Sequence, residues 1–198
     1  MPFGELSPWV AKAVVLVGSI AMVIIRGPHG HRNSKIAVRS SRKGALETSL
    51  LLLVWLGFFL PLIWIWTPVF AFADYPLRVL PFTAGSLCLA VGLWFFYRSH
   101  ADLGTNWSIT LEIREDHRLI TRGVYRWARH PMYAALFLYS IGQALLLPNW
   151  LAGPSYLVTF GTMFAFRVNR EEQMMVDEFG DDYRQYTRET KRLVPGVW

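Results

Sequence analysis

The stretch RWARHPMYAALFLYSIGQALLL, residues 126–147, carries the clearest structural signal in the chain. Basic side chains and a histidine lead directly into Pro131, and a long apolar segment follows. Proline suits the first turn of a helix because its missing N–H group has no helical partner there. The stretch therefore predicts a helix that begins at Pro131. Arg126, Arg129 and His130 fit simple interfacial anchors, but the His-Pro pair and Tyr133 also suit a binding site at the start of a helix.

Four further apolar segments are long enough to cross the hydrocarbon core of a bilayer. Hydrophobic residues make up 53% of the chain and charged residues only 17%, well below the quarter that is typical of soluble domains. Backbone groups in lipid must be satisfied within their own segment, which makes helices the expected structure. The sequence predicts an all-α integral membrane bundle of five transmembrane helices over residues 9–25, 46–66, 79–97, 131–147 and 150–166. Only Pro148 and Asn149 separate the last two, which predicts a tight helical hairpin.

The distribution of basic residues predicts the orientation of this bundle. Of the 20 Lys and Arg residues, all but Lys12 and Arg78 lie in three segments, residues 26–44, 98–130 and 167–198. The five predicted spans place these segments on one side, which the positive-inside rule makes cytoplasmic. We therefore expect the N-terminus outside and the C-terminus in the cytoplasm. This asymmetry explains the net charge of +6 without a nucleic-acid partner.

The sequence lacks the short motifs of several enzyme classes. It contains no G-x-G-x-x-G, Walker A, G-x-S-x-G or H-E-x-x-H pattern. His29 and His31 fall in a predicted loop without carboxylates, which disfavours a metal site. Arg167 and Glu171 are spaced to form an i, i+4 pair if the last helix continues beyond the membrane. Such a pair is either a weak surface contact or, because an ionisable residue at the lipid boundary usually faces a cavity, part of a site.

An ordered set of residues covers the C-terminal half of the chain. It comprises HRLITRGVY (117–125), RHPMY (129–133), Arg167, Glu171 and Glu172, FGDDY (179–183) and Tyr186. In order and spacing, this set resembles the isoprenylcysteine carboxyl methyltransferase family of integral membrane enzymes. The resemblance covers about residues 100–198. One position departs from the pattern, since Ala135 stands where the family often has glycine. Alanine is still small enough for close helix packing.

The resemblance implies S-adenosyl-L-methionine-dependent methylation of the C-terminal carboxylate of a prenylated cysteine. It implies a multi-pass integral membrane enzyme with its active site on the cytoplasmic face and a methyltransferase module in residues 98–198. The three N-terminal helices in residues 1–97 are predicted from the apolar segments and carry no family signature. Arg167 is expected to bind the substrate and to be catalytic. The implied cofactor-binding residues are His117, Arg118, Leu119, Ile120, Tyr125, His130, Pro131, Met132, Tyr133 and Glu171.

This chemistry agrees with the residue types present. A carboxylate with a pKa of about 3.5 is already ionised at neutral pH, so its methylation needs neither a general base nor a metal. Arg167 can hold a carboxylate through a forked pair of donors. Glu171 can accept hydrogen bonds from the cofactor, and free amides near His130 and Pro131 can bind the carboxylate of the cofactor.

Three alternatives stay open at the level of sequence. A membrane methyltransferase acting on a phospholipid amine or a small thiol would need a base or a lowered pKa at its nucleophile. An NADPH-dependent enzyme resembling sterol reductases would be expected to have more spans and a second basic cluster. A non-catalytic membrane scaffold would bind no cofactor. The sequence leaves the oligomeric state open.

Overall fold

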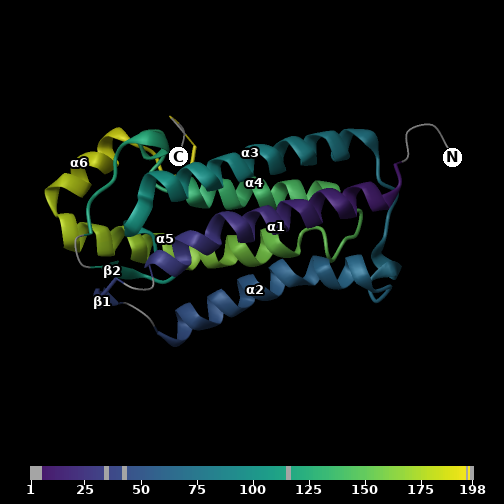
Figure 1. Cartoon of the computed structure of the whole chain (residues 1–198), viewed down its shortest axis with the longest axis horizontal. Coiled ribbons are helices and arrows are strands. Elements are labelled where there is room, and N and C mark those ends of the chain that lie inside the picture. Colours follow the sequence, from purple (N-terminus) through teal and green to yellow (C-terminus); the bar gives the residue numbers. More distant parts are fainter. Residues whose placement is uncertain (1–5, 34–35, 42–43, 115–116, 195, 197–198) are drawn as a thin grey trace.

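The computed structural model describes residues 6–33, 36–41, 44–114, 117–194 and 196. Long helices lie side by side along one axis, and short elements gather at the end of the bundle opposite the N-terminus (Figure 1). The long helices are α1 (Pro8–Asn33), α2 (Ala45–Trp66), α3 (Val79–Leu103), α4 (Pro131–Leu146) and α5 (Ser155–Phe179). The short elements at that end include α6 (Asp181–Glu189), the strands β1 (Val38–Ser41) and β2 (Glu112–Arg114), and the 3-10 turns η2 (Gly104–Asn106) and η3 (Gly123–Arg126).

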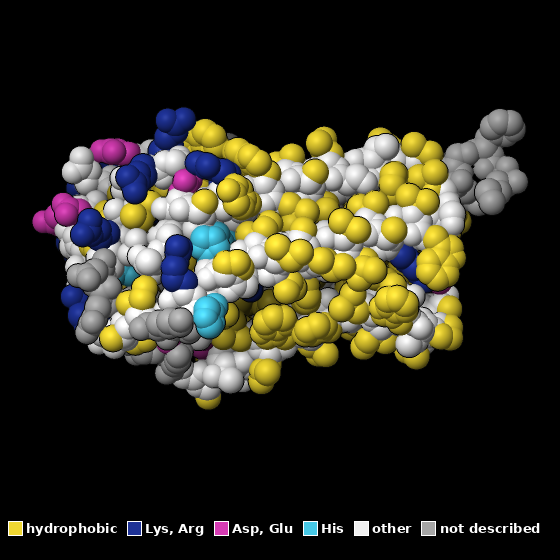
Figure 2. All heavy atoms as spheres, in the orientation of Figure 1, with side chains coloured by type: hydrophobic (Ala, Val, Ile, Leu, Met, Phe, Trp, Pro, Cys, Tyr) yellow, Lys and Arg dark blue, Asp and Glu magenta, His cyan; other side chains and the backbone are white. Residues whose placement is uncertain are grey.

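Four of the five predicted segments fall within long helices to within one residue, and the fifth, 150–166, overlaps α5 only from Ser155 onward. Three of the long helices, α1, α2 and the helix that begins at Val79, are long and apolar enough to cross a membrane. α4 is apolar but shorter, with 16 residues. The apolar side chains cover most of the face seen in Figure 2, whereas charged side chains gather at the end that carries α6. The count of five spans and the orientation stay predictions.

The expectation of an all-α fold is wrong in one detail. β1 and β2 form a small antiparallel sheet, in which Val38 pairs with Arg114. The sheet joins the connection after α1 to the connection after α3. Each strand is short and lies outside the apolar segments, so hydrophobic periodicity carries no signal for it.

The first predicted loop is also partly helical. α1 continues through Pro28 to Asn33, so His29 and His31 lie on a helix and not in a loop. The buried side chain of Asn33 donates hydrogen bonds to the carbonyl oxygens of Gly104 and Trp107. These tertiary contacts hold the end of the helix in place although Gly27, Pro28 and Gly30 disfavour helix in this segment.

The tight hairpin between the last two helices is longer than predicted. α4 ends at Leu146 and α5 begins only at Ser155. Asn149 causes this difference, because its side-chain oxygen accepts hydrogen bonds from the amides of Leu151 and Ala152 and closes a turn. Its amide group donates to Asp74, which ties this turn to the connection between α2 and α3. The apolar residues 150–152 therefore belong to a turn and not to a helix.

Small residues let α3 and α4 pack closely. A Cβ atom at Gly142 would lie 2.8 Å from the carbonyl oxygen of Gly85, and one at Gly92 would lie 3.0 Å from the carbonyl oxygen of Ala135. Close backbone approach at small residues is a usual way for helices to associate in membranes. Ala135 is fully buried at this interface, so alanine still permits the close packing expected at this position.

Candidate functional site

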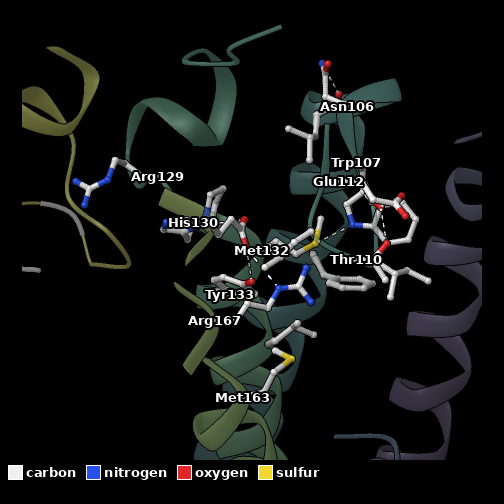
Figure 3. A pocket seen from close by; sticks show the side chains of 18 of the residues that line it. Asn106, Trp107, Thr110, Glu112, Arg129, His130, Met132, Tyr133, Met163 and Arg167 are labelled. Atoms are coloured by element: carbon white, nitrogen blue, oxygen red, sulfur yellow. Dashed lines mark hydrogen bonds and ion pairs between the residues drawn. The ribbon is translucent and has the colours of Figure 1, made fainter. Parts of the chain in front are cut away.

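One cavity of about 230 Å³ lies near the end of the bundle that carries α6 (Figure 3). Side chains of α1, α2, α3, α4, α5 and α6 and of the connection after α3 line it. Its α2 wall is apolar and includes Leu51, Val54 and Phe58, whereas polar side chains come from the start of α4 and the second half of α5. All the predicted site residues line this cavity, namely His117, Arg118, Leu119, Ile120, Tyr125, His130, Pro131, Met132, Tyr133, Arg167 and Glu171.

Arg167 and Glu171 meet Tyr133 at the centre of the polar wall. The Nε atom of Arg167 lies 3.6 Å from Oε2 of Glu171, which confirms the predicted i, i+4 pair. The same carboxylate oxygen accepts a hydrogen bond of 2.5 Å from the hydroxyl of Tyr133. Arg167 is only 8% exposed, and its Nε atom has no hydrogen-bond acceptor among the described residues. Arg167 is therefore buried in the cavity wall, and its partner Glu171 is partly buried there.

Glu47 is a site residue that sequence reasoning missed. It lies in the first turn of α2, is 5% exposed, and places Oε1 3.6 Å from Nη1 of Arg167. The same oxygen accepts a hydrogen bond of 2.8 Å from the amide of Leu111. Glu47 thus connects the N-terminal helices to the C-terminal half of the chain. The available signal was its position as the single charged residue of an otherwise apolar helix.

Glu172 anchors the start of α4 and the C-terminal tail to α5. Its carboxylate accepts hydrogen bonds from Arg129 at 2.8 Å, from Arg192 at 2.7 Å and from His130 at 3.2 Å. Burial alone would raise the pKa of Glu172, but the hydrogen bonds from His130, Arg192 and Arg129 outweigh it and lower the pKa to about 2. Figure 3 shows Arg129 pointing away from Arg167. Glu172 therefore fixes the structure around the cavity.

The amides at the start of α4 are only partly free. α4 begins at Pro131, as predicted. The amides of Arg129 and His130 already donate to the carbonyl oxygens of Lys191 and Arg192 in the tail. These two amides, which precede Pro131, are therefore occupied, because the tail pairs with this segment as a strand would. The amides of Met132 and Tyr133 donate to no backbone carbonyl in the described part of the chain, as expected for a first helical turn.

A glycine with positive φ positions the segment that leads to Tyr125. Gly123 has a φ of 63°, and a Cβ atom there would lie 2.2 Å from a carboxylate oxygen of Asp102. Asp102 instead accepts a hydrogen bond from the amide of Val124. Burial raises the pKa of Tyr125, so its hydroxyl stays protonated and donates to the carbonyl of Ser99. The turn thus fixes Tyr125 in the cavity wall.

Comparison with known proteins places this geometry in a family. Residues 79–177, half of the chain, match the model of the isoprenylcysteine carboxyl methyltransferase (ICMT) family. A protein-S-isoprenylcysteine O-methyltransferase of Schizosaccharomyces pombe is 30% identical over 128 residues, which cover 64% of this chain and 52% of that protein. The human protein of the same name is 36% identical over 86 residues, which cover 43% of this chain and 30% of that protein. The chain therefore spans about half or less of the length of these relatives.

A solved structure has the same fold. It is described as the eukaryotic intramembrane Ras methyltransferase ICMT, and it matches with a TM-score of 0.57 and 24% identity over 92% of this chain and 62% of that chain. Together with the three helices long and apolar enough to cross a membrane, the family match identifies an integral membrane protein. The chain belongs to the isoprenylcysteine carboxyl methyltransferase family.

Proposed function

We propose that this protein transfers a methyl group from S-adenosyl-L-methionine to the carboxylate of a prenylated cysteine. The observation that carries the proposal is the position of Arg167. This buried guanidinium lies in one cavity together with an apolar wall from α2 and the carboxylate of Glu171. A prenyl chain suits the apolar wall, and a carboxylate suits the guanidinium. The names of the relatives support the same substrate class.

The polar wall offers suitable groups for the cofactor. Oε1 of Glu171 makes no hydrogen bond to a described residue and lies 3.7 Å from Nδ1 of His130, so it can accept from an amino or hydroxyl group. The amides of Met132 and Tyr133 are donors at the positive end of the α4 dipole, where a carboxylate binds well. The bound cofactor would supply an electrophilic methyl group. We assign its binding to Glu171, Tyr133 and the first turn of α4, together with the segment 117–125.

The chain itself mainly supplies orientation and exclusion of water. A substrate carboxylate is ionised at neutral pH, so no side chain has to remove a proton from it. Arg167 would hold this group through two parallel hydrogen bonds and fix the direction of the attacking oxygen. Orientation of this kind supplies a large part of the rate enhancement in transfer reactions. We also propose that residues 98–198 form the catalytic module and that residues 1–97 supply the membrane helices around it.

The test of the function is a methyl-transfer assay in detergent. Purified protein receives labelled S-adenosyl-L-methionine and either S-farnesylcysteine, a phospholipid amine or a small thiol. The proposal predicts a base-labile labelled ester on farnesylcysteine only. Labelling of the phospholipid amine or of the thiol would contradict the proposal and would identify the protein as a methyltransferase that acts on that substrate. A protein that neither transfers methyl groups nor binds S-adenosylhomocysteine would be a non-catalytic scaffold.

Glu171 is expected to contribute strongly to cofactor binding. Glu171→Ala should weaken S-adenosylhomocysteine binding by about 1.5–3 kcal/mol, because a buried donor on the ligand would lose its acceptor. Isothermal titration calorimetry in detergent measures this change. The matched control is Glu178→Ala, which removes a carboxylate of the same helix that lies outside the cavity and pairs with Arg39. Equal affinities of wild type and Glu171→Ala would assign Glu171 to a purely structural role.

We also propose that the cavity opens to the cytoplasm. The connections around residues 67–78 and 147–154 contact each other at one end of the bundle, and the tail lies near the other end (Figure 1). In a Cys88→Ala background, a cysteine at the exposed position Ala71 should react with a membrane-impermeant reagent in intact cells. A cysteine at the exposed position Lys191 should react only after lysis. The reverse pattern would place the site on the outer face.

A further inference from the structure

Arg26 of α1 is a cation without a partner in the cavity wall. Its guanidinium lies 5.4 Å from the ring centroid of Phe96 and 5.4 Å from that of Trp107. Its Nε atom is buried without a hydrogen-bond acceptor, and no carboxylate of the described residues lies within ion-pair distance of the side chain. A buried charge is costly unless it is paired, and two aromatic faces compensate only part of that cost. Among the residues that the structure describes, Arg26 therefore has no paired carboxylate.

The partly buried Arg26 differs from Arg167, the buried arginine of the cavity. Arg167 has two carboxylates near its guanidinium, Glu47 and Glu171, each at 3.6 Å. Glu112 also lines the cavity, but its Oε2 atom accepts a hydrogen bond from Ser108 and it forms no ion pair with Arg26. The described carboxylates thus balance the charge of Arg167 and leave that of Arg26 for a ligand.

The position of Arg26 indicates which ligand this is. Arg26 lines the same cavity as Arg167 and as Tyr156, which lies about 16 Å further back along α5. Its neighbours along α1 that line the same cavity are Met22 and Val23. Arg26 therefore lies toward the apolar part of the cavity, whereas the groups assigned to the cofactor lie at the start of α4. An anion that carries a hydrophobic chain fits both the guanidinium of Arg26 and the apolar part of the cavity.

We infer that Arg26 binds the substrate carboxylate together with Arg167, so that the site selects a lipid-linked carboxylate with two guanidinium groups. This inference rests on the proposed function and adds a substrate-binding residue from the first helix. A carboxylate placed between two guanidiniums reduces their mutual repulsion. The methyl ester that the reaction forms has no negative charge, so Arg26 loses its anion when the product forms, whereas Arg167 keeps Glu47 and Glu171. The same pair thus favours binding of the acid and release of the ester.

The experiment compares two ligands that differ only in charge. N-acetyl-S-farnesylcysteine and its carboxamide share the prenyl chain, but only the first carries a carboxylate. Their affinities for the detergent-solubilised full-length protein are measured by calorimetry, along with that of S-adenosylhomocysteine. Arg26→Gln should weaken binding of the carboxylate at least about tenfold and change binding of the carboxamide by less than about twofold. Arg26→Lys should give an intermediate loss, since lysine keeps the charge without the fork.

Controls separate this inference from a structural effect and from the proposed function. Arg32→Gln removes an exposed arginine of the same helix that does not line the cavity, and it should leave all three affinities unchanged. Equal losses for carboxylate and carboxamide in Arg26→Gln would assign Arg26 to packing, and a loss confined to S-adenosylhomocysteine would assign it to the cofactor. Either result, or no loss, overturns the inference while the proposed function stands. A wild-type protein that does not distinguish the two ligands overturns the inference, and the methyl-transfer assay tests the proposed function separately.

Discussion

Replacing Arg167 by lysine should lower kcat/KM for a prenylcysteine substrate by at least about tenfold. The guanidinium lies between the carboxylates of Glu47 and Glu171, and a lysine there keeps the positive charge that both of them need. The change removes only the planar fork that can hold a carboxylate at two points. Affinity for S-adenosylhomocysteine should stay nearly unchanged, because Glu171 keeps a cationic neighbour and its hydrogen bond from Tyr133.

Steady-state kinetics on S-farnesylcysteine and calorimetry with S-adenosylhomocysteine measure these two effects. Arg170→Lys is the matched control, since Arg170 is an exposed arginine of the same helix. Full activity of the Arg167→Lys variant would exclude Arg167 as the residue that orients the substrate. A parallel loss of cofactor affinity would assign Arg167 to the cofactor pocket.

The second large effect is expected on stability. Glu172→Ala should lower the free energy of unfolding by about 3 kcal/mol or more, because it leaves the charges of Arg129 and Arg192 without their carboxylate. Arg129 is the more costly loss, since its side chain is only 9% exposed. Thermal unfolding followed by tryptophan fluorescence in detergent measures the change. Asp181→Asn is the control, because it breaks an exposed ion pair with Arg184 and should cost less than about 1 kcal/mol.

The same cluster predicts a dependence of stability on pH. Folding lowers the pKa of Glu172 from 4.5 to about 2, so folding favours the ionised form. The resulting stabilisation is fully present above pH 4.5 and is lost as the pH falls toward 2. The difference in stability between wild type and Glu172→Gln should therefore shrink over this range. If the difference in stability between the two proteins stays constant down to pH 2, the charge of Glu172 contributes nothing to the stability of the fold.

The sequence predicted the features that depend on local chemistry. The start of α4 follows from Pro131, whose missing N–H group fits the first helical turn. The pairing of Arg167 with Glu171 follows from helical spacing. The segments that meet around the cavity follow from the family motif, because that motif marks residues that are close in space although distant in the chain. Their individual roles in binding and catalysis stay predictions.

The features that the sequence did not predict depend on contacts between distant segments. Glu47 and Arg26 lie in segments without a motif. The packing of α2 against α5 brings Glu47 to Arg167, and the packing of α1 against α3 places Arg26 in the wall of the same cavity. The turn at Asn149 depends on the hydrogen bonds of its side chain. The apolar residues that follow it predict a helix, so the sequence pattern does not indicate this turn. The occupied amide of His130 depends on the tail, which lies some sixty residues further along the chain.

The apolar wall of the cavity has a consequence for how members of this family diverge. Its residues on α1 and α2 lie outside residues 79–177, the segment shared at the level of the family. Arg167, Glu171 and the start of α4 all lie inside that segment. Substitutions on the first two helices can therefore reshape the surface that we propose meets a hydrocarbon chain, while the groups that we propose meet the methyl donor stay the same. Under selection, the lipid that is accepted can then change independently of the chemistry.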